Sequence, residues 1–537
     1  MNGEQRNKPA VTDKTQVHIV GGGMAGLAAA IFTVRDAHIP GKNVHVYEGR
    51  GKVGGSLYGE GTPDTNFFTL GDWKFNDKAY NCTWNVLSEI PSLDSPGKSV
   101  TQEIFDYNRT HKKNARSRLI HANHTADNVE TMQLNWKQRA KMIRLLFIDE
   151  STIDNRRIDS WFDPPFFKTN FWKVFSSMFA IEYWNDLVEM QRYMRRFFHA
   201  VHLMVSGRAE TVTPYNNYNS MTEPMRAWLD KQGVNFEMGC TVKDLDFKPA
   251  QDTLTVERLY VTKNGKQETR EIKEADFVFV TNGSMIADVR RGSMTSPAAF
   301  EQGKLDGSWT LWENIVRKRP NAGLGNPSNF CDRRDQSAWT YFVVNSTDPL
   351  FFNLYEQSTG NKPGQANMVT FTDSNWHSSI LVPNHPHFRN QPKDRYIYLG
   401  CGFMPFEKGN FVDKKMADCN GEEMLTEICR HFGFDKELPR ILKTSTCIPV
   451  MAPYVMSHFL TRKNSDRPRV VPEGSKNLAF MGQFTESGEC VMLVESSIRS
   501  AMMAVTTLLH TGKKVPPVYS GVTNPLILLR AFVTLMK

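Results

Sequence analysis

The sequence lacks the features of a secreted, membrane-spanning or metal-binding chain. Its 537 residues include only eight cysteines, and none of them forms a CxxC pair or another spacing typical of a metal site. Scattered cysteines of this kind are typical of reduced thiols in the cytosol. No run approaches the ~18 to 20 continuous apolar residues of a membrane helix, and the polar N-terminus has no signal-peptide core. We therefore expect a cytoplasmic protein without a metal ion.

The sequence also has no strong charge of either sign. Its 65 Lys and Arg and 57 Asp and Glu residues are spread over the whole length and leave a net charge of +8. This density is too low for a nucleic-acid-binding surface and favours a mildly basic, soluble surface. Attraction to anionic lipids or to a carboxylate substrate is the alternative. A chain of this length, with 40% hydrophobic residues, is expected to fold into two or three globular domains.

A dinucleotide-binding motif lies near the N-terminus. The β-like run 17–20 leads into a glycine-rich turn and then into a helix-favouring segment. Gly21 permits the turn, Gly23 lets the backbone approach a pyrophosphate, and Gly26 allows close packing of helix on strand. The N-terminus of the helix, at Met24 and Ala25, offers free N–H groups to phosphates.

A second strand, residues 44–47, strengthens this interpretation. It ends at Glu48, twenty-two residues after Gly26, where a carboxylate can accept both ribose hydroxyls. The segment that follows resembles the extended glycine-rich loop of flavoproteins, which favours FAD over NAD, and its candidate cofactor-binding residues are Gly49, Arg50, Gly54, Gly55 and Ser56.

Two later strands end in small-residue turns of the kind found beside a flavin. Residues 275–283 end at Asn282 and Gly283, and residues 477–483 end at Gly482 and Gln483. The segment 220–269 reads as a helix followed by strands, and we expect it to join the same domain beside the strand that ends near Thr281. The sequence therefore predicts an α/β fold in which distant segments assemble a Rossmann-type FAD-binding domain, with a mixed α+β substrate domain and a helical cap. The expected boundaries are 1–105, 211–290 and 441–510 for the FAD-binding domain, 106–210 for the cap, 291–440 for the substrate domain and 511–537 for an apolar C-terminal segment.

Aromatic residues are dense at helical spacing in the predicted cap. Such residues usually form a helix core, and the alternative is the lining of a site for a long apolar substrate; they are Phe171, Trp172, Phe175, Phe179, Trp184, Phe197 and Phe198. Trp136, Met142, Ile143 and Leu146 are expected to share one helix face. Residues 524–537 are too short to span a bilayer, but they could dock on the protein, on a partner subunit or on a membrane surface.

With these segments placed, the chain resembles the fatty acid hydratase family, the oleate hydratases once described as myosin-cross-reactive antigens. The resemblance extends from Val17 to about Leu509 and is carried by residues 90–100, 157–162, 166–172, 215–218, 281–285, 373–376, 386–392, 421–427 and 467–474. It implies an FAD-dependent, redox-neutral addition of water to a cis double bond of a free, long-chain unsaturated fatty acid. It also implies a homodimer.

The resemblance assigns the proton donor to Tyr218 and a place near the substrate to His387 and Asn375. In the family a Glu in a glycine-rich loop handles the water, but here that loop reads Thr69 to Asp77, and the Glu position falls on Lys74 or Phe75. Asp72 or Asp77 could substitute from a shifted position. Two alternatives remain open: a repurposed isomerase, cyclase or redox flavoenzyme acting on a polyene or other metabolite, and a non-catalytic lipid-binding flavoprotein.

Overall fold

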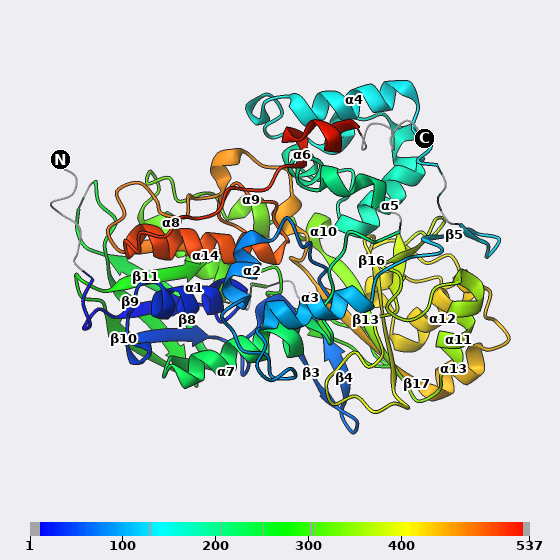
Figure 1. Cartoon of the computed structure of the whole chain (residues 1–537), viewed down its shortest axis with the longest axis horizontal. Coiled ribbons are helices and arrows are strands. Elements are labelled where there is room, and N and C mark those ends of the chain that lie inside the picture. The colour runs from blue at the N-terminus through cyan, green and yellow to red at the C-terminus, as the bar shows by residue number, and fades with distance from the viewer. Residues whose placement is uncertain are drawn as a thin grey trace.

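A five-stranded parallel sheet organises one half of the computed structural model, which describes residues 11–529 except 128, 130, 204, 205, 251, 301, 302, 305 and 306 (Figure 1). In sheet order its strands are β18 (Leu478–Met481), β11 (Phe277–Thr281), β1 (Val17–Val20), β2 (Val44–Glu48) and β7 (Asn235–Met238). All five strands fall within the segments predicted for the FAD-binding domain. The predicted Rossmann-type α/β fold is confirmed.

Alternate residues of this sheet face two different layers. Ile19 and Phe279 pack against one layer, whereas Val20 and Val280 pack against the other. The first layer contains α1 (Met24–Arg35), α2 (Asn81–Leu87), α7 (Glu223–Lys231) and α14 (Val494–Leu508). The second contains the antiparallel sheet of β8 (Cys240–Phe247), β9 (Val256–Lys263) and β10 (Lys266–Glu271), together with α8 (Gly307–Lys318).

The position of β7 differs from the sequence prediction. The segment 220–269 was expected to lie beside the strand that ends near Thr281. Instead β7 pairs with β2 at the opposite edge of the sheet, and β8 to β10 form a separate sheet. The reason is that strand order is determined by tertiary packing and is not encoded in a strand's own sequence.

An eight-stranded mixed sheet organises the other half of the molecule (Figure 1). In sheet order its strands are β12 (Arg290–Arg291), β17 (Ser445–Ala452), β13 (Trp339–Ser346), β16 (Tyr396–Gly402), β15 (Ser378–Leu381), β14 (Val369–Phe371), β5 (Leu119–Ile120) and β6 (Ala126–Asp127). Its membership crosses two expected boundaries, because β17 falls in the segment assigned to the FAD-binding domain and β5 and β6 fall in the segment assigned to the cap.

Alternate residues also divide the faces of the larger sheet. Phe342 and Tyr398 point to the layer of α11 (Leu350–Thr359), α12 (Gly421–Phe432) and α13 (Leu438–Thr444). Tyr341 and Leu399 point to the opposite face, where the cap lies. The cap therefore packs on this face of the eight-stranded sheet.

The cap consists of α4 (Trp136–Phe147), α5 (Asn170–Phe179) and α6 (Leu187–Phe197), which lie above the two sheets in Figure 1. Each helix begins at a residue whose side chain accepts a backbone N–H, namely Asn135, Thr169 and Asp186. The predicted common face of α4 is wrong at its first residue, since Trp136 is 73% exposed while Met142 and Leu146 are buried.

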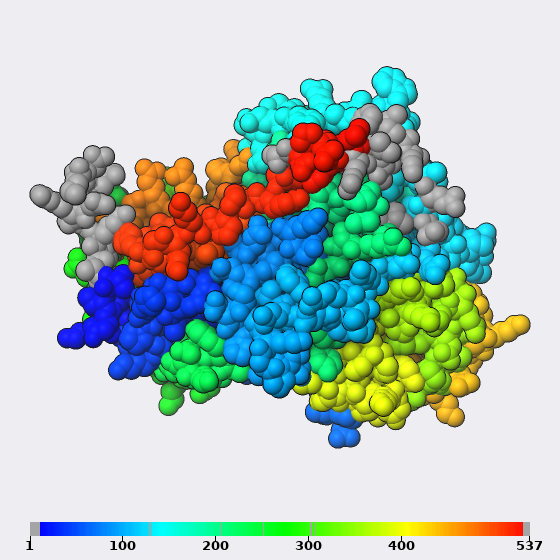
Figure 2. All heavy atoms as spheres, viewed as in Figure 1, coloured from blue at the N-terminus to red at the C-terminus, as the bar shows by residue number. Residues whose placement is uncertain are grey.

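The chain is completed by shorter elements and by a C-terminal extension. The remaining helices and strands are α3 (Val100–Thr110), α9 (Ser328–Cys331), α10 (Arg334–Ser337), β3 (Gly59–Thr62) and β4 (Asn66–Thr69). Figure 2 shows the C-terminal part of the described chain, in red, crossing the surface from α14 toward the cap. No helix within the described ranges is long and apolar enough to cross a bilayer.

Candidate active site

The first glycine turn joins β1 to α1 at the carboxyl edge of the parallel sheet. Gly21 has a φ of +101°, and its N–H donates to the Tyr47 carbonyl at 2.8 Å. A Cβ on Gly26 would lie 1.9 Å from the Gly21 carbonyl oxygen, so no other residue fits there without moving the turn. Gly23 is the N-cap of α1 and provides no side-chain cap, which leaves the N–H groups of the first turn directed outward.

Glu48 ties this turn to the second glycine loop. One carboxylate oxygen accepts the Gly22 N–H at 2.8 Å, and the other accepts the Arg50 N–H at 2.8 Å. The Gly54 N–H donates to the Gly22 carbonyl at 2.9 Å, and a Cβ on Gly55 would lie 3.1 Å from the Gly23 Cα. The two loops therefore pack backbone against backbone, which only glycine allows.

The other predicted members of the second loop also belong to this arrangement. Gly49 has little room for a side chain, since its Cβ would lie 3.1 Å from the Thr241 hydroxyl. Arg50 donates through Nη2 to the Ile286 carbonyl at 2.8 Å, and the Ser56 carbonyl accepts the Trp73 indole N–H at 3.4 Å.

The ends of β11 and β18 complete the same edge. Gly482 has a φ of +96°, and its N–H donates to Ser500 Oγ at 2.9 Å. The Gln483 amide donates to the Leu493 carbonyl at 3.2 Å, and the Asn282 amide donates to the Phe484 carbonyl at 3.1 Å. Gly283 has a φ of +65°. Four segments that are distant in sequence thus converge where parallel α/β sheets bind ligands.

These features fit a dinucleotide cofactor such as FAD. Gly23 and Gly55 leave a groove that side chains would fill, and the first turn of α1 opens onto it. Thr281 Oγ1 is buried without a hydrogen-bond partner among the described residues, and it lies 3.1 Å from where a Gly21 Cβ would be. A polar ligand beside the turn would satisfy this hydroxyl.

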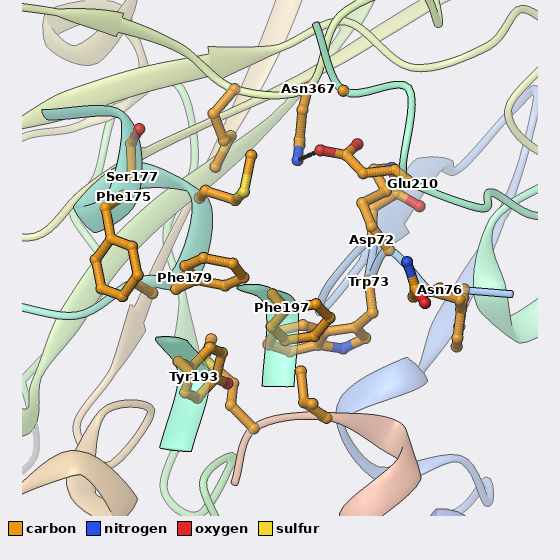
Figure 3. Close-up of a pocket in the computed structure, with 18 of the residues that line it drawn as sticks. Asp72, Trp73, Asn76, Phe175, Ser177, Phe179, Tyr193, Phe197, Glu210 and Asn367 are labelled. Atoms are coloured by element: carbon orange, nitrogen blue, oxygen red, sulfur yellow. Dashed lines mark hydrogen bonds and ion pairs between the residues drawn. The ribbon is translucent and has the colours of Figure 1, made fainter. Parts of the chain in front are cut away.

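A cavity of about 240 Å³ lies between the cap, the eight-stranded sheet and the loop 70–76. Most of its wall is apolar, as Figure 3 shows, and is formed by Met142, Phe171, Phe175, Phe179, Tyr193, Phe197 and Phe198 of the cap region and by Tyr341, Leu399 and Cys401 of the sheet. Five of the seven predicted cap aromatics line the cavity, and the exceptions are Trp172 and Trp184. These five aromatics therefore belong both to the packed core of the cap and to the cavity wall.

The cavity reaches the cofactor edge through its wall residues. Trp73 lines the cavity and its indole N–H bonds to Ser56 of the second glycine loop. Met492 and Leu493 also line it, and the backbone of both residues bonds to the Gln483 side chain. A ligand in the cavity would thus contact the same residues that border the glycine groove.

One side of the cavity is polar. Asp72 and Lys74 line it and form an ion pair with each other. Burial opposes ionisation of Asp72, but the Lys74 ammonium, with His387 and Lys113 nearby, outweighs burial and holds the pKa of Asp72 below its usual range. Asp72 is therefore an anion whose charge is balanced by Lys74.

Glu210 and Asn367 extend this polar side. Asn367 Nδ2 donates to Glu210 Oε1 at 2.8 Å, and Figure 3 shows the two side chains turned toward each other at the cavity. Behind them Lys113 Nζ donates to the Ala366 carbonyl at 3.1 Å, and burial together with the Lys74 charge lowers the pKa of Lys113 to about 7.

The remaining predicted site residues fall into two groups. Phe75 lines the cavity, but it is 2% exposed and packs on Tyr80 and Trp84. His387 is buried close to Asp72, and burial lowers its pKa to about 4. By contrast, Asp77 and Asn375 are exposed and do not line the cavity. The structure therefore gives no support to the roles predicted for Asp77 and Asn375, because neither side chain lies at the cavity.

Tyr218 lies at the glycine loops and is not part of the cavity wall. It begins a π-helical turn, Tyr218–Thr222, a feature often found at functional sites. A Cβ on Gly54 would lie 3.2 Å from the Tyr218 ring, and Lys52 Nζ lies 3.7 Å from the ring centroid. Burial raises the pKa of Tyr218, with a further contribution from Glu223.

Sequence reasoning missed Lys113, Glu210 and Asn367. They come from three separated segments, so no local spacing connects them. The only available signal was that Lys113 and Glu210 lie within the segment assigned to the cap and Asn367 within the segment assigned to the substrate domain.

Together the glycine groove and the apolar cavity define a protein of the FAD-binding class. Solved structures agree on the fold: cyclohexylamine oxidase from Brevibacterium oxydans IH-35A has a TM-score of 0.53 at 12% identity, covering 93% of this chain and all of that one. A redesigned putrescine oxidase has a TM-score of 0.51 at 12% identity, covering 92% of this chain and 99% of that one.

Sequence relatives define the family. The model of the MCRA family matches residues 14–506. An oleate hydratase from Streptococcus pyogenes serotype M49 (strain NZ131) is 32% identical, over 98% of this chain and 90% of its own length. A linoleate hydratase from Lactiplantibacillus plantarum is 29% identical, over 91% of this chain and 93% of its own length. The chain belongs to the MCRA family, and the resemblance to fatty acid hydratases is confirmed.

Proposed function

We propose that this chain is an FAD-binding hydratase that adds water to a double bond of a long-chain unsaturated fatty acid. The observation that carries the proposal is the apolar cavity with one polar side. Three of its wall residues, Trp73, Met492 and Leu493, also border the glycine groove. An apolar wall suits an acyl chain, and a polar side suits a water molecule and its developing charges. Family membership with two curated fatty acid hydratases supports the same activity.

The cofactor would be held by backbone groups. Gly21 to Gly26 and the first turn of α1 would bind the pyrophosphate, Glu48 would anchor the ribose side, and Gly54, Gly55, Gly482 and Gln483 would border the flavin. When bound, FAD supplies a polar ring system that stabilises charge beside the double bond, without net electron transfer.

Tyr218 is the proton donor in this proposal. Since Tyr218 is not part of the cavity wall, the double bond has to reach past Trp73 toward the glycine loops, where Asn217, the neighbour of Tyr218, accepts the Trp73 backbone N–H at 2.6 Å. A phenol is protonated at neutral pH and can give its proton to an alkene carbon. Burial raises the pKa of Tyr218 and so makes it a weaker acid, which means that the transfer depends on groups that stabilise the charge it creates. The Lys52 ammonium, 3.7 Å from the ring centroid, contributes positive charge that favours the phenolate left after transfer. The phenolate then recovers a proton, so the reaction is redox-neutral.

The test uses the purified, FAD-loaded protein with oleate and linoleate in heavy-oxygen water. We expect a hydroxy acid that carries one heavy oxygen atom. An unlabelled isomer would support the isomerase alternative, and no turnover with oxidised or reduced flavin would favour the lipid-binding one. Either result contradicts the hydratase proposal.

We also propose that the cap contacts an anionic membrane surface. Helix α4 carries Lys137, Arg139, Lys141 and Arg144 and no acidic residue. Exposed apolar side chains accompany this charge: Trp136 (73%), Phe147 (62%), Leu526 (70%) and Leu529 (60%). Helix α6 contacts both α4 and the turn Gly521–Thr523, and Figure 2 shows the C-terminal part of the described chain, in red, beside the cyan cap region. This combination is typical of interfacial binding and would bring a fatty acid to the cap.

Part of the predicted apolar segment lies outside the described residues, which end at residue 529. Phe532, Val533 and Met536 belong to that part. The homodimer and the cytoplasmic location also remain predictions, and analytical ultracentrifugation tests the first of them directly.

A further inference from the structure

The carboxylate of Glu210 occupies an unusual position on the polar side of the cavity. Its Oε1 accepts the Asn367 amide at 2.8 Å, whereas Oε2 is buried and has no hydrogen-bond partner among the described residues. An unsatisfied buried carboxylate oxygen is energetically unfavourable unless a ligand or water meets it. Because Glu210 lines the cavity, that partner would be a molecule inside the cavity.

The backbone holds Glu210 firmly beside the loop 70–76. Its N–H donates to the Gly207 carbonyl at 3.0 Å, and the next residue, Thr211, exchanges two hydrogen bonds with Phe75, of 2.8 and 2.9 Å. The Asn76 amide donates to the Ala209 carbonyl at 2.9 Å. The side chain of residue 210 is therefore fixed next to the loop whose own position 75 carries phenylalanine.

The other carboxylate of the cavity wall is less suited to accept a proton. Asp72 is paired with Lys74. Burial alone would raise the pKa of Asp72, but the Lys74 charge outweighs burial and keeps this pKa below the usual range. A carboxylate stabilised in this way is a weak base. Glu210 has no ion-pair partner of this kind at contact distance among the described residues, although Lys113 and Arg118 are close enough for their charges to interact with it.

We propose that Glu210 holds the attacking water through Oε2 and accepts its proton. The inference rests on the hydratase function proposed above. As the alkene carbon takes a proton from the acid, the π electron pair forms the new C–H bond. The water oxygen then forms the C–O bond with the other carbon, and a water proton passes to Glu210. Glu210 returns that proton to solvent or to the acid, so no atom or electron is left over.

The test compares Glu210→Gln and Glu210→Asp with the wild type, using heavy-oxygen incorporation into oleate. The Gln side chain can still accept the Asn367 amide but lacks the charge. We expect Glu210→Gln to lower kcat by at least ~100-fold, within the usual range for a lost general base, and to change KM by less than about threefold. Glu210→Asp should lie between the two. Glu89→Gln, exposed and outside the cavity, is the control and should keep the wild-type rate.

The pH profile separates a base from a structural residue. Wild-type kcat/KM should fall on the acid side as the base becomes protonated, and this limb should disappear from the residual activity of Glu210→Gln. Flavin loading and Tm of each variant establish that it is folded. If Glu210→Gln does not fold, the test compares kcat of Glu210→Asp with that of the wild type. A lowered kcat would support the inference, and an unchanged kcat would overturn it.

The remaining outcomes distinguish this inference from the proposed function. A wild type that incorporates heavy oxygen while Glu210→Gln retains its rate refutes the role of Glu210 alone. A larger loss in Asp72→Asn than in Glu210→Gln would assign the base to Asp72 instead. A wild type that forms no labelled product contradicts both.

Discussion

Replacing Gly26 by alanine should specifically damage the cofactor site. The new Cβ would lie 1.9 Å from the Gly21 carbonyl oxygen and 3.1 Å from its carbon, so either the turn or the start of α1 must move. A shift of about 1 Å takes phosphate-binding N–H groups out of the 2.7 to 3.2 Å range of a good hydrogen bond. Hydrogen bonds to charged groups contribute about 1.5 to 3 kcal/mol each, and the loss of two corresponds to at least ~100-fold weaker FAD binding.

Gly51→Ala is the matched control for this prediction. It lies in the second glycine loop, but its Cβ would meet nothing within 4 Å. FAD affinity is measured by titrating the apoprotein and following flavin fluorescence, with circular dichroism to establish folding. Gly51→Ala should bind FAD like the wild type. Binding by Gly26→Ala within threefold of the wild type would refute the role assigned to the first turn.

Three further predictions concern the acid, the polar side of the cavity and the cap. Tyr218→Phe should lower kcat for hydration at least ~100-fold with unchanged FAD affinity, and full activity would remove Tyr218 from the mechanism. The pKa of Lys113 is about 7 in the folded protein, against an ordinary value of 10.5, so this buried lysine destabilises the fold. At about 1.4 kcal/mol per pKa unit, the loss of folding free energy is about 5 kcal/mol. The full loss applies below pH 7, and it disappears as the pH rises to 10.5. Lys113→Met should therefore have a higher free energy of unfolding in urea than the wild type at pH 7, and the difference should shrink toward pH 10. A difference that does not change with pH would contradict the lowered pKa of Lys113. Trp136→Ser combined with Leu526→Ser should weaken binding to anionic vesicles at least threefold in a sedimentation assay, with Ser88→Ala as control, and equal binding would exclude this surface.

The cofactor edge could be predicted from the sequence because its signals are local. Gly21, Gly26 and Glu48 lie within one βαβ unit, and steric requirements at each glycine leave a recognisable spacing. The two later strands could be assigned because each is a short buried run that ends in glycine. Their order in the sheet could not be assigned, as the placement of β7 shows.

The polar side of the cavity could not be predicted in the same way. Asp72 and Lys74 were candidates because they lie in the altered loop, but Lys113, Glu210 and Asn367 come from segments that meet this loop only in the folded structure. Helical spacing of the cap aromatics indicated a buried face, but spacing does not reveal whether that face meets other side chains or a ligand.

The difference between Asp77 and Glu210 illustrates the same limit. Asp77 lies in the altered loop itself. Glu210 comes from a distant part of the chain and is brought beside the loop by the backbone bridge between Phe75 and Thr211. Sequence reasoning could consider only the first, and the structure places that one at the surface. A substitute carboxylate can therefore be found only when the three-dimensional structure is known.

The central claim is that this protein adds water to an unsaturated fatty acid at a flavin that does not change redox state. The most direct measurement is a single turnover of FAD-loaded protein with oleate in doubly labelled water, with the flavin absorbance followed throughout. We predict a product with one deuterium on carbon and one heavy oxygen, and a constant flavin spectrum. Deuterium without heavy oxygen, or flavin reduction in proportion to product, would contradict the account.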